Sequence, residues 1–444
     1  MQLLDKEASS SSESCVDPAL IISSDGHAMA KMAEYRSYLP SRWHEEFDAF
    51  LELYREHGFI LGDRKNLAVQ MDKETLDPWL RDVIDAGRLD GTSDPARRLF
   101  RMDVEGIAAE VLFPDFGLPF QLAPPQAEAA VGYTRTHEQA EAGRRAHNRW
   151  LVDFCSAAPE RFVGQAILSF QDVESAIQEI RWAKDAGLQG VVLPAFDETL
   201  PLYDPRHDPI WQTLAELEMP VNTHSGISST TMRVIPNNRK AAPHVACAFT
   251  MFGEESFFFC HQVLSQLIWG GVLERHPNLK VIFTEQGSGW VVSWLKANDY
   301  KYEGSYLSHD LHEVMPYKPT EYFQRQVFLG SSIFSRAEIE DRHQIGLDKM
   351  MLGMDYPHIE GTWGTDEGGT RSYLQATLGR AHVPVAEAEM LLNGNVAARF
   401  SFDLEKLERV SRRIGPSMSA ILTPPTEDRF PRGDVNKPSG MGGR

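Results

Sequence analysis

The sequence has little of several features that would identify a common class of protein. It holds four cysteines in 444 residues; Cys15, Cys155, Cys247 and Cys260 form no C-x-x-C pair, which argues against a disulfide scaffold and favours a reducing compartment. No apolar run reaches the ~18 residues that a membrane span needs. Residues 1–18 are serine-rich and lack the basic and apolar regions of a secretory signal. We therefore expect a cytoplasmic protein with no membrane partner.

Concentrated positive charge is also missing. The chain has 44 Lys and Arg against 63 Asp and Glu, for a formal net charge of −19, and no tract is rich in Lys or Arg. Nucleic acids and anionic membranes attract clustered cations, so the composition argues against both partners. Because the acidic residues are spread along the whole chain, the charge does not identify a ligand.

The chain divides into a core and two unpatterned ends. We predict a disordered leader over residues 1–18, one domain over 19–414 and a disordered or extended tail over 415–444, since neither end has hydrophobic periodicity. Within the domain, apolar segments typical of buried strands alternate with helical stretches. The eight predicted strands are residues 20–24, 108–113, 162–168, 189–193, 220–224, 280–285, 326–331 and 350–355.

Eight repeats of strand and helix predict an α/β fold, a closed (β/α)8 TIM barrel with helical insertions at its C-terminal rim. The longest insertion covers about residues 28–99 and is rich in aromatic and charged residues. It could form a substrate lid, an oligomer interface or a helical layer packed on the barrel. A second excursion, residues 225–255, is expected to cover the same rim.

Metal-ligating residue types stand at the ends of four predicted strands. Asp25 and His27 follow the first strand, and His224, Glu285 and Asp355 close the fifth, sixth and eighth. The carboxyl ends of barrel strands meet at one rim, where this fold builds its active sites. Each residue alone is weak support, because Asp often caps turns and His often makes one core hydrogen bond. The joint pattern predicts a metal site at the rim.

Two further histidines stand near this rim. His261 begins a predicted helical run after the fifth strand, where it could ligate a second metal, touch substrate, cap the helix or belong to the core. His358 lies three residues past Asp355, and could be a ligand, an acid or base, a substrate contact or an ordinary loop histidine.

Together these motifs resemble the amidohydrolase superfamily. The resemblance rests on Asp25-x-His27, on His224, on the run from Gly353 to His358 and on Asn393-Gly394-Asn395-Val396-Ala397-Ala398-Arg399-Phe400, and it spans about residues 20–405. It is greatest to the amidohydrolase-related branch that includes aminocarboxymuconate semialdehyde decarboxylase. The resemblance implies a metal-dependent TIM-barrel enzyme.

The sequence departs from the usual family pattern in three places. Asp25 replaces the first histidine of His-x-His, and Glu285 stands where strand 6 usually ends in histidine. The bridging carboxylated lysine of many members is absent, since the fourth strand closes as Val191-Val192-Leu193-Pro194. The predicted site is therefore rich in oxygen ligands, which suit iron or manganese at least as well as zinc.

With this carboxylate-rich set of predicted ligands, the chain also resembles the non-haem di-iron monooxygenases of platensimycin and platencin biosynthesis. Under that hypothesis the chain uses two Fe ions and dioxygen to hydroxylate a bulky, apolar, diterpenoid-like substrate in antibiotic biosynthesis, and the substrate is expected to be a coenzyme A (CoA) thioester. The expected catalytic residues are Asp355, Glu285 and His358, and the expected metal ligands are Asp25, His27, His224, His261, Glu285 and Asp355.

Two other readings stay open. In the first, the chain is a hydrolase or decarboxylase with one Zn or Mn ion, and Asp355 takes or returns a proton. In the second, it is a catalytically silent barrel kept for binding. The aromatic insertion would also serve a homodimer interface.

Overall fold

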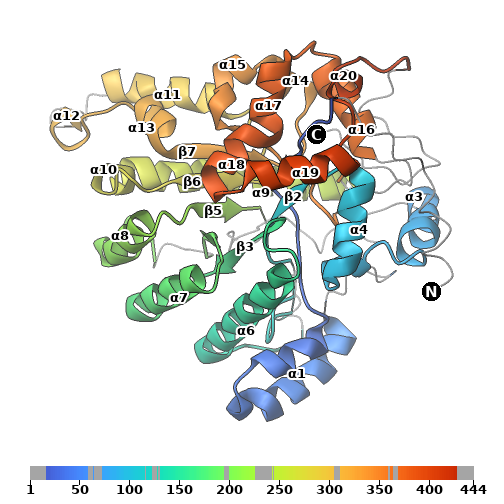
Figure 1. The fold of residues 1–444 in the computed structure, drawn as a ribbon. Helices are drawn as coiled ribbons and strands as arrows, with labels where there is room; N and C mark the ends of the chain where they lie inside the picture. Colours follow the sequence, from blue (N-terminus) through green and yellow to red (C-terminus); the bar gives the residue numbers. More distant parts are fainter. Residues whose placement is uncertain are drawn as a thin grey trace.

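The computed structural model describes residues 17–427 with short gaps. The gaps are residues 59–63, 65–72, 116, 123–127, 129–130, 195–199, 226–242, 244, 305–310, 359–360 and 364–368. The predicted second excursion therefore lies largely outside the described residues. Eight parallel strands form one sheet in the order β1 to β8, and helices surround it (Figure 1).

All eight predicted strands are present, and the predicted TIM-barrel fold is confirmed. The sheet closes where the backbone N–H of Ser24 donates to Leu352 O at 2.7 Å and Gly26 bridges to Tyr356. The strands are β1 Ile22–Ser23, β2 Ala109–Leu112, β3 Phe162–Ile167, β4 Gly190–Val192, β5 Val221–His224, β6 Val281–Thr284, β7 Val327–Ser331 and β8 Met350–Leu352.

Helices fill the connections between strands and form the outer layer in Figure 1. The longer ones are α4 Pro95–Glu105, α6 His137–Ser156, α7 Val173–Asp185, α8 Asp208–Glu216, α9 Val245–Trp269, α11 Val291–Gly304, α13 Pro319–Gln326 and α19 Leu404–Ile414. The shorter ones are η5 Pro205–His207, α10 Val272–Arg275, α12 Leu311–Val314, α14 Arg336–Glu340, α15 Arg342–Ile345, η7 Leu347–Lys349, α16 Gly369–Leu374, η8 Gln375–Gly379, α17 Val385–Glu389, η9 Met390–Gly394, α18 Asn395–Phe400 and α20 Met418–Ile421.

The barrel interior is packed, and one of its ends is covered. Val111, Ile282 and Phe328 share a buried cluster with Phe400 of α18 and Leu407 of α19. The α18 helix is fixed to the start of β8, because the Asn395 side chain donates to Met350 O at 2.7 Å. These helices therefore cover the N-terminal end of the barrel, and the C-terminal rim is left for the site.

The insertion after β1 packs on the barrel. It contains η1 Met32–Tyr38, η2 Ser41–Trp43, α1 His44–His57, α3 Lys73–Trp79, η3 Leu80–Ile84 and η4 Asp90–Thr92. Tyr35, Phe47 and Phe50 are buried in the main core, and Trp79 packs edge-on against Trp363 at 5.5 Å between ring centroids. These aromatic side chains favour the packed helical layer among the three predicted roles.

The two ends of the described chain meet. The Met418 N–H donates to Asp17 O at 2.8 Å, and Pro18 bridges to Ser417. Within the segment predicted as a tail, α20 buries Met418 and Ile421, so the packed chain continues past residue 414. Residues 1–16 and 428–444 lie outside the described part, and the domain limits remain predictions. None of the helices in the described part is both long and apolar enough to cross a membrane.

Candidate metal centre

Four of the predicted ligands meet at the C-terminal rim. Asp25 and His27 follow β1, His224 ends β5 and Asp355 follows β8, and all four are buried. Oδ1 of Asp25 lies 3.3 Å from Nε2 of His224 and 3.8 Å from Nε2 of His27. Nε2 of His27 also lies 3.4 Å from Oδ1 of Asp355. Residues far apart in the chain thus present two imidazoles and two carboxylates to one small volume.

Hydrogen bonds to main-chain carbonyls orient both imidazoles. Nδ1 of His27 lies 2.7 Å from Pro114 O, and Nδ1 of His224 lies 2.8 Å from Ser225 O. A carbonyl only accepts, so each Nδ1 carries the proton and donates it. In the neutral imidazoles each Nε2 would then direct its lone pair toward the carboxylates, as a metal-ligating histidine requires.

Two buried atoms at the centre support a bound cation. Among the described residues, Nε2 of His27 and Oδ2 of Asp355 are buried and have no hydrogen-bond partner. Buried polar atoms are nearly always satisfied by protein, water or an ion. Asp25, His27 and His224 also place one ligand atom each within 4.8 Å of one another. The donor set therefore fits a divalent metal ion.

The charges at the centre are strongly coupled. Burial lowers the pKa of His224, but the hydrogen bond and charge of Asp25, together with Glu285, outweigh it and raise the pKa to about 9. Burial raises the pKa of Asp355, but His358 and His27 outweigh it and hold the pKa well below its usual range. Without metal the neighbouring carboxylates thus favour the protonated form of His224, and a metal ion would compete with that proton.

His358 joins the ligands from the loop after β8. Its Nδ1 lies 2.9 Å from Oδ1 of Asp355, and its ring centroid lies 4.2 Å from that of His27. Its Nε2 lies 3.5 Å from Oδ1 of Asp115. Burial disfavours its charge, but Asp355 and Asp115 outweigh burial and raise the pKa of His358 well above its usual value.

Glu285 lies beside this group. Its Oε2 is 3.4 Å from Nδ1 of His224, and its Oε1 is 4.0 Å from Nδ1 of His358. It therefore approaches His224 from the side away from Nε2. Glu285 and Asp355 have φ values of 56° and 54°. This left-handed region is unfavourable for residues other than glycine, and such residues recur at functional sites.

The structure places His261 outside the two ligand groups. Those groups are Asp25, His27 and His224, and His27, Asp355 and His358. The ring of His261 packs against Trp290 with centroids 4.9 Å apart. The prediction that His261 begins its helix is wrong, because α9 runs over Val245–Trp269 and the largely apolar stretch before His261 continues the helix.

Three groups in the site were not predicted. Asp115 contacts His358, the carbonyl of Pro114 orients His27, and Oγ of Ser332 donates to Oδ2 of Asp25. Pro114 and Asp115 come soon after β2, and Ser332 directly follows β7. The rule that chemistry gathers at strand ends would have found all three.

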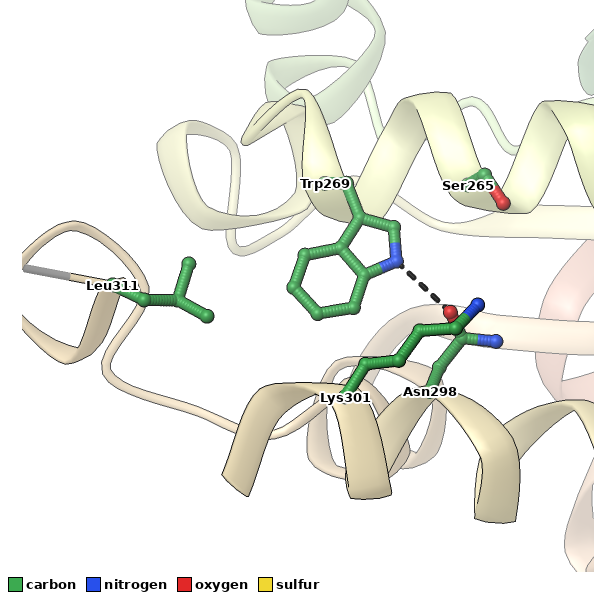
Figure 2. A pocket seen from close by; sticks show the side chains of 5 residues that line it. All are labelled: Ser265, Trp269, Asn298, Lys301 and Leu311. Carbon is green, nitrogen blue, oxygen red and sulfur yellow. Dashed lines mark hydrogen bonds between the residues drawn. The ribbon is translucent and has the colours of Figure 1, made fainter. Parts of the chain in front are cut away.

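A cavity of about 350 Å³ lies elsewhere, in the outer layer between α9 and α11. Figure 2 shows its lining, with Nε1 of Trp269 donating to Oδ1 of Asn298 at 3.1 Å. Ser265, Lys301 and Leu311 complete the lining. None of the candidate ligands lines this cavity, so we do not assign it to the metal centre.

Imidazoles and carboxylates at the C-terminal rim of a (β/α)8 barrel are typical of metal-dependent enzymes. The sequence profile of the family described as Amidohydrolase matches residues 113–402, more than half of the chain. The chain therefore belongs to the amidohydrolase family, as the sequence motifs predicted.

The similar proteins include several decarboxylases. The gamma-resorcylate decarboxylase of a Polaromonas species is 26% identical over 273 residues, which cover 59% of this chain and 76% of that protein. The 2-amino-3-carboxymuconate-6-semialdehyde decarboxylase of Dictyostelium discoideum is 27% identical over 213 residues, covering 47% of this chain and 55% of that protein. A structure of 5-carboxyvanillate decarboxylase from Novosphingobium aromaticivorans, complexed with manganese and 4-hydroxy-3-methoxy-5-nitrobenzoic acid, shares the fold at 19% identity and a TM-score of 0.58, covering 88% of this chain and all of that one.

These findings correct the functional prediction. The curated relatives are decarboxylases, so the predicted di-iron monooxygenase, with its assignment to iron, oxidoreductase chemistry and antibiotic biosynthesis, is wrong. The error has a physical cause, because carboxylate ligands suit manganese as well as iron. The carboxylates Asp25 and Glu285 at positions where the family usually has histidine therefore do not indicate an oxygenase.

Proposed function

We propose that the chain is a metal-dependent decarboxylase of small carboxylic acids, with hydroxylated benzoic acids as the first class to test. Of the two activities left open by the mononuclear reading, the decarboxylase relatives favour decarboxylation over hydrolysis. The observation that carries the proposal is the buried meeting of Asp25, His27, His224 and Asp355 at the C-terminal rim.

The geometry favours a single cation. His27 belongs to both ligand groups, and its Nδ1 is engaged by Pro114 O. Its one remaining nitrogen can bind only one ion, so the two groups cannot each hold a metal through His27. We therefore propose one Mn or Zn ion in place of the two Fe ions predicted from the sequence. When bound, such an ion would orient the substrate carboxylate and withdraw negative charge from it.

We assign proton delivery to His358. Loss of CO2 from an aromatic acid needs a proton at the ring carbon that carries the carboxylate. The carbon–carbon bond then breaks, its electron pair stays on the ring, and the proton has replaced CO2. His358 lies between the carboxylates of Asp355 and Asp115, both of which stabilise its protonated form. A positioned acid of this kind contributes roughly 10² to 10⁴ in rate.

Glu285 and Asp355 keep supporting roles in this proposal. Asp355 contacts both His27 and His358, so it can ligate the cation and hold the proton donor. Glu285 contacts Nδ1 of His224 and stabilises that imidazole on the side away from Nε2. The role of His261 as a ligand stays a prediction.

The proposed function also decides which of the predicted partners are kept. The substrate is a small molecule, while the CoA thioester and dioxygen belonged to the rejected monooxygenase and are not carried forward. A homodimer and a cytoplasmic location stay predictions from the sequence.

The test is CO2 release under nitrogen. Metal-free protein is reloaded with Mn²⁺ or Zn²⁺ and given 2,6-dihydroxybenzoate, 5-carboxyvanillate or 2-amino-3-carboxymuconate semialdehyde. We expect release from at least one acid, dependent on the metal and lost in His358→Gln. Equal release by the metal-free protein, or none from any of the acids, would overturn the proposal.

A further inference from the structure

A buried ion pair lies directly behind the loop that carries Asp25 and His27. Nε of Arg98, in α4, donates to Oε2 of Glu110, in β2, at 2.6 Å. The two side chains are 0% and 3% exposed. Removing two charges from water is unfavourable unless further contacts satisfy them. The other contacts of the Arg98 guanidinium therefore indicate the role of this ion pair.

The Arg98 guanidinium touches both loops that carry the ligands. Its Nη1 donates to the carbonyl of His27 at 2.9 Å. Its Cζ lies 4.0 Å from the ring centroid of Tyr356, the residue next to Asp355. The two loops are also joined directly, since the His27 N–H donates to Tyr356 O at 2.6 Å and the Asp355 N–H to Asp25 O at 3.1 Å.

Gly26 shows how closely the guanidinium approaches the first loop. A Cβ added at this position would lie 2.6 Å from Nη2 of Arg98 and 3.4 Å from Oε1 of Glu110. Side-chain atoms do not tolerate the shorter distance, so a larger residue would push the loop and the guanidinium apart. The glycine between Asp25 and His27 is therefore explained by the buried arginine.

We infer that Arg98 is a positioning residue for the metal centre. It fixes the spacing between the ligands after β1 and the ligand after β8 before a cation binds, and Glu110 holds it in place. This inference rests on the proposed metal centre but not on which acid is decarboxylated. Substituting a group that orients metal ligands typically lowers metal affinity or activity 10- to 100-fold.

The test compares two arginine–carboxylate pairs near β2, of which only the Arg98 pair contacts the loops that carry the ligands. One variant is Arg98→Met with Glu110→Gln, which leaves no unpaired buried charge. The control is Arg161→Met with Asp103→Asn. Arg161 pairs with Asp103 at 2.9 Å and donates to the carbonyl of Ala108 at 2.8 Å, beyond the N-terminal end of β2.

The readouts are the dissociation constants for Mn²⁺ and Zn²⁺, from competition with a chelator, and the melting temperature. We expect the Arg98 pair variant to weaken metal binding roughly 10- to 100-fold. The control should lower the melting temperature while binding metal as the wild type does. Where the double variant does not fold, Gly26→Ala and Arg98→Lys provide the same readout, and Arg98→Lys should fall between wild type and the double variant.

Each outcome decides the inference. Wild-type metal affinity in the Arg98 pair variant, or in Gly26→Ala if the pair variant does not fold, would overturn it even in an active decarboxylase. Weakened affinity confined to these variants would support it even if no tested acid were decarboxylated. A wild-type chain that binds neither ion would overturn both the inference and the proposed function.

Discussion

Nδ1 of His358 lies 2.9 Å from Oδ1 of Asp355. The carboxylate proposed as a metal ligand therefore also holds the side chain proposed to deliver the proton. One consequence is that metal binding and proton delivery are linked through a single carboxylate. A second is that substitutions of the two residues should have different effects, because only one of them is needed to hold the ion.

Asp355→Asn should remove the metal. The amide keeps the size of the side chain but loses the charge that balances the cation, so we expect metal affinity to fall at least about 100-fold and activity with it. Metal per chain after dialysis, measured by mass spectrometry, checks this. The control is Asp48→Asn, which breaks an exposed pair with Arg36. Full metal content in Asp355→Asn would contradict the ligand assignment.

His358→Gln should separate catalysis from metal binding. We expect kcat to fall roughly 10²- to 10⁴-fold, because the proton donor is lost, while metal per chain stays at the wild-type level. Asp115→Asn should lower kcat less, since Asp355 still contacts the imidazole. His343→Gln, at a histidine that is 59% exposed, is the matched control. A His358→Gln enzyme with unchanged kcat would remove this residue from the mechanism.

Gly353→Ala should disturb the centre through Asp25. A Cβ at Gly353 would lie 2.6 Å from Cβ of Asp25 and 2.9 Å from Cα of Ser332, and overpacking of this kind costs roughly 1–3 kcal/mol. We expect lower stability and weaker metal binding. Gly304→Ala is the control, because in the described part of the chain its added Cβ would meet no atom within 4 Å beyond its neighbours and its own helix backbone. Chemical denaturation and metal titration of both variants would test the contrast, and equal behaviour would refute it.

Glu105 should make stability depend on pH away from the metal centre. Burial raises its pKa to about 7, although Thr370 and Arg101 oppose the shift. The folded chain thus binds this proton more tightly than the unfolded chain does, which stabilises the fold below about pH 4.5 and is lost as the pH rises through about 7. Each pH unit in that window costs about 1.4 kcal/mol.

Glu105→Gln should remove this dependence, because the amide imitates the protonated carboxyl. The free energy of unfolding of the variant, relative to wild type, should therefore rise between pH 5 and 7 by roughly 2–3 kcal/mol. Urea denaturation at each pH measures it. Glu52→Gln, at an exposed pair with Arg55, should show no such trend. Parallel pH profiles of wild type and Glu105→Gln would contradict the raised pKa.

Short-range pattern was sufficient to predict the fold. Each strand is a short apolar run that ends in turn or ligand residues, as in Val221–His224 and Met350–Leu352. Parallel strands with helical connections allow few other arrangements, and the barrel rule then brought Asp25, His224 and Asp355 together. These ligands could be predicted because the fold, rather than local sequence, determines where strand ends lie.

The groups behind the ligands could not be predicted in the same way. Glu110 stands within a strand and Arg98 within an amphipathic helix, positions where a charge usually faces water. Both charges are buried where Arg98 of α4 meets Glu110 of β2, a contact between elements that local sequence does not reveal. The type of reaction was mispredicted for a related reason, since ligand chemistry limits the metal more strongly than it limits the substrate.

The most direct test of the central claim is the gas balance of the metal-loaded protein with a hydroxylated benzoic acid. The decarboxylase account predicts one CO2 released per acid consumed, at the same rate with and without oxygen, with about one Mn or Zn ion per chain and no activity after Asp355→Asn. Oxygen uptake in step with substrate loss, without release of CO2, would contradict it.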